Sequence, residues 1–244
     1  MIALLLVVRG DEGLRQERGL VFMSLTIGGV SCSAILILQN GKTMKKTLST
    51  LALVACVMSA SVIAAGDPVA GKAKSAACMG CHGMDGNSPA DAFPKIAGQH
   101  EGYLYKQLQD YQSGKRANPL MMPMVANLQE ADLQDLAAYY AAQTTSEGTA
   151  ASDQMALGKT IYHAGIKAKG IAACAACHGP TGAGNVQAGF PRVSGQHAAY
   201  AVDQLKQFGA GTRANDMASM MRTVAAKMSE TEMQAVAEYM QGLR

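Results

Sequence analysis

Tryptophan is absent from the sequence, and aromatic residues as a group make up only 5% of its 244 positions. A hydrophobic core of this composition contains few large, rigid side chains. We therefore expect another bulky apolar group to fill part of the core. Charged residues are also scarce, at 16% against about 25% in typical soluble domains. Part of this deficit comes from an apolar amino-terminal segment.

The amino-terminal segment contains the pattern of an export signal. Met44-Lys45-Lys46 gives it a basic start, residues 48–63 are largely apolar, and the small residues Ala64-Ala65-Gly66 follow. We predict a signal peptide at residues 44–64, cleaved after Ala64 or Ala65. The alternative is a retained membrane anchor, but the apolar stretch is shorter than the roughly 20 residues that a membrane-spanning helix needs.

Residues 1–43 precede this signal. In them a charged stretch, residues 9–18, separates two apolar stretches, residues 1–8 and 19–38. We interpret residues 1–43 as an extension read from an upstream start codon and absent from the natural protein, because Met44 begins a complete signal. A genuine amino-terminal membrane segment is the alternative.

No excess of either charge remains once residues 1–64 are removed. These residues hold six of the 21 basic side chains and three of the 18 acidic ones, so 15 of each remain. Binding to nucleic-acid phosphates needs clustered Lys and Arg. The composition therefore argues against a nucleic-acid partner.

Spare cysteine is absent as well. Cys32 and Cys56 lie in the amino-terminal segment, and the other four cysteines form two Cys-x-x-Cys-His motifs. The motifs are Cys78-Met-Gly-Cys81-His82 and Cys174-Ala-Ala-Cys177-His178. No cysteine remains for a disulfide framework, although an exported protein could form one.

The two motifs belong to an internal repeat. They are offset by 96 residues, and the segments Phe93-Pro94 and Gly98-Gln99-His100 recur 97 residues later. Further along, residues 133–139 recur as residues 233–239, at an offset of 100. The offset grows in steps, as expected when short insertions fall in loops.

Residues 144–152, between the two repeats, are small and polar and show no periodicity, which is typical of a linker. We therefore predict an amino-terminal domain at residues 65–143, a linker at residues 144–152 and a carboxy-terminal domain at residues 153–244. Domains of this size form marginal cores and are often stabilised by an additional group.

The pattern of the two repeats is helical, and no stretch in them alternates as a strand would. Asp67-Pro68 is typical of a helix start, and this helix is expected to run into Cys78. Ser229-Glu-Thr-Glu232 is a capping box that opens a helix through Met240. Further helices are expected at residues 100–112 and 130–142. The predicted fold class is all-α.

Cys-x-x-Cys-His is the signature of covalent haem attachment in c-type cytochromes. Two thiols three residues apart can each form a thioether with one vinyl group of the same porphyrin, and the adjacent His then lies beneath the iron. A redox-active thiol pair or half of a zinc site would explain a single copy. Two copies at equivalent places behind an export signal favour two haem c groups. The predicted attachment residues are Cys78, Cys81, Cys174 and Cys177, and the predicted iron ligands are His82 and His178.

A low-spin electron-transfer haem needs a sixth iron ligand, and a Met thioether raises its reduction potential. The candidates are Met121, Met122 and Met124 in the first repeat and Met217, Met220 and Met221 in the second. The offset of 100 pairs Met121 with Met221, whereas the offset of 97 would pair Met124 with Met221. Residues just downstream keep the offset of 100, so we predict Met121 and Met221. His100 and His197 are the alternatives, but their place at helix starts favours a structural role.

Residues 66–244 resemble the dihaem cytochrome c4 family. The resemblance rests on both haem motifs, the Phe-Pro and Gly-Gln segments, the stretch from Asn215-Asp216 through Met221 to Lys227, and the closing Tyr239-Met-Gln-Gly242. It implies two cytochrome c folds related by a pseudo-twofold axis, haems that meet through their propionates at the domain interface, and His/Met ligation. It also implies that the carbonyl oxygens of Pro94 and Pro191 accept hydrogen bonds from the two ligand histidines.

Six-coordinate iron leaves no open position for a substrate, so we expect an electron carrier and not an enzyme. With its export signal, we expect the protein to be a monomer in the bacterial periplasm, with peripheral membrane association as an open alternative. The resemblance also implies two redox partners, a quinol-oxidising cytochrome complex and a terminal oxidase. Two other classes stay open: the haem subunit of a flavocytochrome dehydrogenase, and a dihaem peroxidase in which one iron loses its Met.

Overall fold

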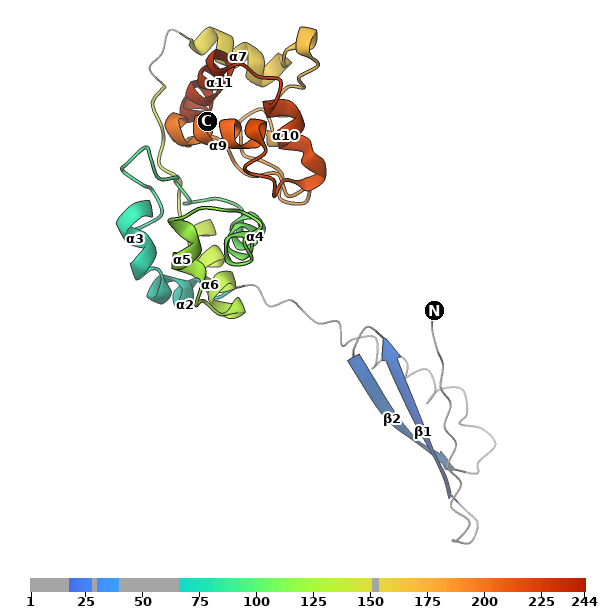
Figure 1. Ribbon diagram of the computed structural model, residues 1–244. Helices are drawn as coiled ribbons and strands as arrows, with labels where there is room; N and C mark the ends of the chain where they lie inside the picture. The colour runs from blue at the N-terminus through green and yellow to red at the C-terminus, as the bar shows by residue number, and fades with distance from the viewer. Residues whose placement is uncertain (1–17, 28–29, 40–65, 151–153) are drawn as a thin grey trace. The chain divides into compact units, whose positions relative to one another are not determined.

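The computed structural model describes residues 18–27, 30–39, 66–150 and 154–244 (Figure 1). The chain divides into two compact units, residues 1–63 and residues 64–244. The predicted signal peptide at residues 44–64, with both cleavage positions, lies outside the described residues. Among the helices of the described ranges, none is long and apolar enough to cross a membrane.

The first unit contains an antiparallel hairpin that the sequence analysis did not anticipate. Strand β1, Arg18–Ile27, pairs with strand β2, Val30–Gln39, so that Arg18 lies opposite Gln39 and Ile27 opposite Val30. Both segments are mostly apolar, with polar residues at only a few positions, and periodicity alone does not distinguish such runs from a buried helix. The prediction of an all-α fold is confirmed for the repeats, which make up the second unit.

The second unit contains two successive sets of helices. The first set is α2 Pro68–Lys74, α3 Ala76–His82, α4 Glu101–Gln112, α5 Met121–Val125 and α6 Glu130–Ala141. The second set is α7 Met155–Ala164, the 3-10 helix η1 Lys167–Lys169, α8 Ala175–His178, α9 Ala198–Ala210, the 3-10 helix η2 Met217–Ser219, α10 Met220–Ala225 and α11 Glu230–Gly242. Helices α4, α5 and α6 correspond to α9, α10 and α11.

Local sequence explains where these helices begin. The side chain of Asp67 caps α2 by accepting a hydrogen bond from Val69 N (2.8 Å). Ser229 and Glu232 form the predicted capping box at the start of α11. The first predicted helix is interrupted, because buried Ser75 donates its hydroxyl to Lys72 O and separates α2 from α3.

Each half has its own hydrophobic core. In the first half, Leu104 of α4 packs with four residues of α6: Leu136, Ala137, Tyr139 and Tyr140. In the second half, α7, α9 and α11 contribute Ile161, Tyr162, Leu205, Phe208, Met233, Val236 and Met240. Each sequence repeat therefore folds around a core of its own, built from equivalent helices.

Glycine allows the helices of each half to cross closely. A Cβ atom on Gly71 of α2 would lie 2.0 Å from the carbonyl oxygen of Asp135 in α6. A Cβ atom on Gly158 of α7 would lie 2.1 Å from the carbonyl oxygen of Ala235 in α11. Because Asp135 and Ala235 are offset by 100 residues, the two crossings are equivalent, and α2 corresponds to α7.

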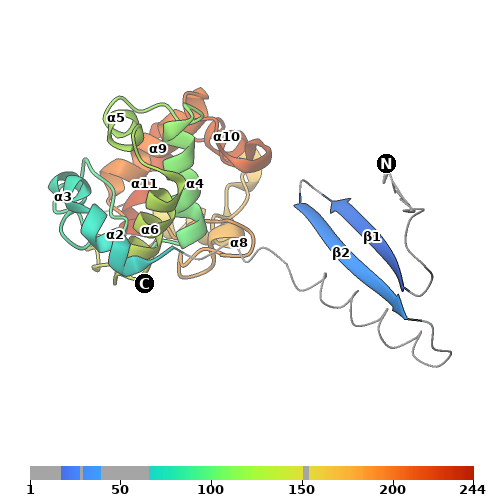
Figure 2. The ribbon, with the colours of Figure 1, turned by 90° about the horizontal axis from the view of Figure 1, so that it is seen from below.

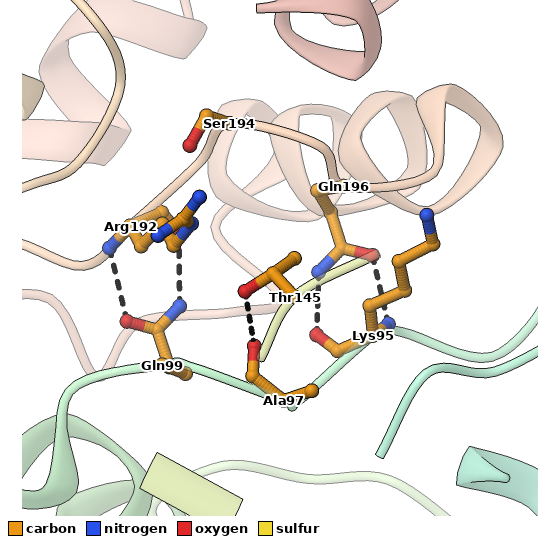
Figure 3. A pocket seen from close by; sticks show the side chains of 7 residues that line it. All are labelled: Lys95, Ala97, Gln99, Thr145, Arg192, Ser194 and Gln196. Carbon is orange, nitrogen blue, oxygen red and sulfur yellow. Dashed lines mark hydrogen bonds between the residues drawn. The ribbon is translucent and has the colours of Figure 1, made fainter. Parts of the chain in front are cut away.

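Two glutamines join the halves through reciprocal hydrogen bonds (Figure 3). Gln196 accepts from Lys95 N (2.9 Å) and donates to Lys95 O (2.8 Å). Gln99 accepts from Arg192 N and donates to Arg192 O, both at 2.9 Å. Each glutamine thus binds one peptide segment of the other half as a neighbouring strand would. Since both pairs are related by the offset of 97, the bonds follow a pseudo-twofold axis.

Candidate functional site

The first Cys-x-x-Cys-His motif lies on α3. Cys78 is half-buried and Cys81 is exposed, and neither forms a disulfide. His82, the last residue of the helix, is buried. Gly83 follows with φ of 80°, a conformation that glycine adopts without strain, and the chain turns away from the helix there.

The second motif has the same arrangement. Cys174 is half-buried, Cys177 is exposed, both thiols are free, and buried His178 ends α8. Burial raises the pKa of the Cys174 thiol to about 11, and burial also raises the pKa of the Cys78 thiol. These cysteines are therefore protonated at neutral pH, unlike the thiolates of reactive thiol pairs. The finding argues against the alternative of a redox-active thiol pair.

Each motif histidine binds a proline carbonyl. His82 Nδ1 lies 2.9 Å from Pro94 O, and His178 Nδ1 lies 2.9 Å from Pro191 O. Because a carbonyl oxygen can only accept, each Nδ1 must carry the proton, and each Nε2 keeps its lone pair for a metal. Burial lowers the pKa of both imidazoles, which favours the neutral form that ligates iron.

The donor set fits haem c and not zinc. A structural zinc site needs four ligands. Over the described residues, however, no group of three or more His, Cys, Asp or Glu side chains could hold a metal ion. Each half instead has two free thiols beside one histidine of fixed tautomer, as covalent haem attachment requires.

The predicted sixth ligands occupy corresponding short helices. Met121 begins α5, Met221 is the second residue of α10, and both are half-buried. Helices α6 and α11 begin at Glu130 and Glu230, which supports the offset of 100 used to choose the two methionines. Their rivals Met122, Met124 and Met217 are exposed. Half-buried Met220 aligns with Leu120, which cannot bind iron.

Comparison with known proteins settles the family. The cytochrome c family model matches twice, at residues 68–142 and 155–244. Cytochrome c4 of Pseudomonas aeruginosa is 48% identical over 181 residues, covering 74% of this chain and 90% of that protein. Cytochrome c4 of Azotobacter vinelandii is 44% identical over 210 residues, covering 82% of this chain and all of that protein. The chain belongs to the cytochrome c4 family.

The fold agrees with solved cytochrome c4 structures. The crystal structure of reduced recombinant cytochrome c4 from Pseudomonas stutzeri matches with a TM-score of 0.72 and 45% identity, covering 74% of this chain and 100% of that chain. As a member of this family, the chain is a dihaem electron-transfer protein with two covalently attached haem c groups, and it exchanges electrons with redox partners.

The alternative sixth ligands, His100 and His197, lie between the two halves. His197 Nε2 lies 2.9 Å from Ser88 O in the other half, so this nitrogen carries a proton and cannot ligate iron in this arrangement. His100 Nε2 is buried without a hydrogen-bond partner beside Gly184. Both histidines therefore belong to the interface, as their predicted structural role requires.

An arginine network that was not predicted from the sequence joins the two halves. Arg116 donates to Gln107 of its own half (2.8 Å) and to Gln204 (2.6 Å) and Tyr200 (3.0 Å) of the other half. Arg213 makes the equivalent bonds in reverse. The network consists of Tyr103, Gln107, Arg116, Tyr200, Gln204 and Arg213. Figure 1 shows α4 and α9, which supply the tyrosines and glutamines, on facing sides of the two halves, and in Figure 2 the two helices overlap in the view from below.

The only sequence signal for this network is the repeat. Arg116 and Arg213 are offset by 97 residues and both are buried. A buried arginine needs satisfied hydrogen bonds, because an unpaired charge away from water is costly. Each guanidinium also covers an aromatic ring of its own half, Tyr111 at 4.6 Å and Phe208 at 4.4 Å.

Proposed function

We propose that this chain is a periplasmic electron shuttle between a quinol-oxidising cytochrome complex and a terminal oxidase. The observation that carries the proposal is the duplication of one site: in each half a histidine beside two free thiols has its Nδ1 bound to a proline carbonyl. Two such haem sites in one unit allow an electron to enter at one and leave at the other.

The geometry described above supports the following ligand sets. Cys78 and Cys81 would hold the first haem, and Cys174 and Cys177 the second. His82 and Met121 would bind the first iron, and His178 and Met221 the second. When bound, each haem supplies a one-electron Fe(III)/Fe(II) couple. The proline carbonyls orient the histidines and strengthen Nε2 as a donor.

The domain limits, location and oligomeric state are part of the same proposal. We place the domains at residues 65–143 and 153–244, with the linker between them. Described linker residues contact both halves, since Ser146 O accepts from Lys95 Nζ (3.2 Å) and Thr149 O accepts from Gln241 Nε2 (2.7 Å). A signal peptide at residues 44–64 would direct a monomer to the periplasm.

The test starts from protein matured with its own leader in a bacterium that assembles c-type cytochromes. Intact mass is expected to give a chain that begins after Ala64 or Ala65 and carries two haems. The purified protein is then added to a quinol-oxidising complex with quinol and, separately, to terminal oxidase. Fast reduction by the first and fast reoxidation by the second are expected.

The matched controls are Met121→Ala and Met221→Ala, each of which opens one iron while the other stays intact. Each variant is expected to bind carbon monoxide at one reduced haem, whereas the wild type binds none. A protein that delivers no electrons to oxidase contradicts the shuttle, and carbon monoxide binding by the wild type supports the peroxidase alternative.

A second candidate function has support from the comparisons. A thiosulfate dehydrogenase electron acceptor of Stutzerimonas stutzeri is 42% identical over 173 residues, covering 67% of this chain and 77% of that protein. The chain would then receive electrons from a dehydrogenase. Reduction by thiosulfate with its dehydrogenase, at a rate above that with the quinol-oxidising complex, would favour this candidate. Co-purification with a flavoprotein would instead favour the flavocytochrome alternative.

A further inference from the structure

The two methionine loops differ in length and in chemistry. The first half passes from Asn118 to Met121 in three residues, whereas the second half needs six residues from Asn215 to Met221. The longer loop contains η2, whose last two residues, Ala218 and Ser219, turn the chain directly into α10. The repeat therefore breaks down beside one of the two proposed sixth ligands.

The longer loop has a strained backbone. Ala218 has φ of 49° and Ser219 has φ of 58°, and neither is glycine. Side chains with a Cβ atom are disfavoured in this region, and such residues persist only where the surroundings hold them. Something in the structure must therefore stabilise the turn that leads into Met221.

Arg222 and Asp216 supply that stabilisation. Arg222 Nε donates to Asp216 Oδ1 (2.7 Å), and Arg222 N donates to Asp216 Oδ2 (3.1 Å). Arg222 Nη2 donates to the hydroxyl of Ser219 (2.8 Å), inside the strained turn. The Asp216 side chain is only 5% exposed and that of Arg222 34%, so water screens this ion pair less than one at the open surface. The two residues close the loop around Met221.

The first half holds its methionine by other means. Asn118 Oδ1 accepts from the backbone N–H groups of Leu120 and Met121, both at 2.9 Å. Residues 118–125 contain no charged side chain, and Met122 occupies the position that Arg222 has in the second half. The first half therefore has an uncharged turn where the second half has an ion pair, which we call the Asp216–Arg222 clamp.

We propose that Asp216 and Arg222 are positioning residues for Met221. By fixing the ends of the strained loop, the clamp keeps the Met221 thioether in place and makes its loss from the second iron slower than the loss of Met121 from the first. The inference rests on the proposed ligation by Met221. The clamp also makes the two proposed haem sites differ in how fast the methionine dissociates, although the histidine contacts of the two sites are equivalent.

The test measures how fast each methionine leaves its iron. Imidazole binds oxidised six-coordinate haem only after the methionine has dissociated, so its binding rate at saturation reports that step. The ring-current-shifted methyl signals of the two ligated methionines in the reduced protein assign each phase to one haem. In wild-type holoprotein, imidazole is expected to bind the second haem more slowly than the first.

Arg222→Met copies the residue of the first half, and Asp216→Asn removes the charge at constant volume. Both are expected to accelerate imidazole binding at the second haem about tenfold, equivalent to about 1.4 kcal/mol, and to leave the first haem unchanged. Arg222→Lys keeps the charge but not the forked geometry, so an intermediate rate is expected.

Lys169→Met is the matched control, because Lys169 forms an ion pair with Glu232 (2.7 Å) in the same half and is similarly exposed, at 39%. If Arg222→Met and Asp216→Asn bind imidazole at the second haem no faster than Lys169→Met, the clamp has no positioning role. Should Arg222→Met fail to assemble, the Asp216→Asn result decides alone. If wild-type protein lacks a shifted methyl signal for the second haem, the ligation by Met221 is itself wrong.

Discussion

A tyrosine packs beside the first cysteine of each haem motif, but the two tyrosines come from different helices. In the first half Tyr140 of α6 lies beside Cys78 and Ser75. In the second half Tyr162 of α7 lies beside Cys174 and donates its hydroxyl to Gly179 O (2.6 Å). Burial raises the pKa of both phenols.

The helix crossings explain why the tyrosine comes from α6 in one half and from α7 in the other, which we call the tyrosine exchange. Ser75 and Tyr162 each lie four residues after the crossing glycine, and Met240 takes the place of Tyr140 at the offset of 100. In each half a tyrosine is thus paired with a smaller residue, Tyr140 with Ser75 and Tyr162 with Met240. Sequence comparison of the repeats could not reveal this, because the pair must be seen together in space.

The first prediction concerns this exchange. Tyr140→Met should leave a small void beside Cys78 and lower the free energy of unfolding of the protein by roughly 1–2 kcal/mol. Adding Ser75→Tyr recreates the arrangement of the second half and should recover part of that loss. Urea unfolding of the holoprotein measures both changes, and a double variant less stable than Tyr140→Met would contradict the exchange.

At the scale of helices, the crossings at Gly71 and Gly158 predict sensitivity to a single methyl group. Either glycine changed to alanine would push a Cβ atom against a backbone carbonyl, which cannot move aside as a side chain can. We expect a loss of about 1–3 kcal/mol in the free energy of unfolding for each variant.

The control for these variants is Gly102→Ala on α4, where an added Cβ would meet no atom within 4 Å. Since alanine favours the helix by up to about 1 kcal/mol over glycine, this control should be neutral or stabilising. Thermal unfolding compares the three variants. Equal melting temperatures for all three would refute close packing at the crossings.

Lys74 of α2 forms ion pairs with two carboxylates of α6, and these ion pairs predict that stability depends on pH. Lys74 Nζ lies 2.6 Å from both Asp132 Oδ1 and Asp135 Oδ2. The hydrogen bond from Lys74, followed by one from the backbone of Asp67, lowers the pKa of Asp135 below its ordinary value of 3.8. Such a group stabilises the fold above its unfolded pKa, and this stabilisation is lost as the pH falls through the lower folded pKa.

Asp135→Asn should therefore be less stable than wild type at neutral pH, and the difference should disappear in acid. Urea unfolding at a series of pH values measures it, with exposed Asp91→Asn as the control. A difference that stays constant down to the acid limit would mean that charge at Asp135 contributes nothing.

Helix positions were largely predictable because capping residues and apolar periodicity are local signals. The capping box at Ser229 and the start at Asp67 needed no knowledge of the fold. The break at Ser75 was not predictable, since it depends on a buried hydroxyl that bonds to the preceding turn. The hairpin of β1 and β2 was missed because these mostly apolar segments show no sustained alternation of polar and apolar residues.

At the scale of the whole molecule, the arginine network predicts that the two halves unfold together. Arg116 and Arg213 bind the same two glutamines from opposite sides. Removing both arginines leaves the buried Gln204 amide oxygen without its two donors and leaves that of Gln107 with Asn215 Nδ2 alone (3.0 Å), and an unsatisfied buried group costs about 1–3 kcal/mol. The double variant Arg116→Ala/Arg213→Ala should show two separate calorimetric transitions where wild type shows one. A single unshifted transition would contradict this, and exposed Lys115→Ala is the control.

The haem sites were predictable because their chemistry is covalent and local, with thiols and ligand within five residues. The choice of Met121 and Met221 stays a prediction that the register of α6 and α11 supports. The interface was beyond prediction, since its partners are about 100 residues apart and their pairing follows from the pseudo-twofold axis alone.

The glutamine bridges have a consequence for how one half senses the other. Gln196 grips the peptide of Lys95, the residue directly after the proline whose carbonyl holds His82, and Gln99 does the same beside the proline that holds His178. Each half thus fixes the backbone beside the carbonyl that orients the proposed iron ligand of the other half. A half expressed alone would lack these hydrogen bonds, and the orientation of its motif histidine should be the first feature to become less fixed.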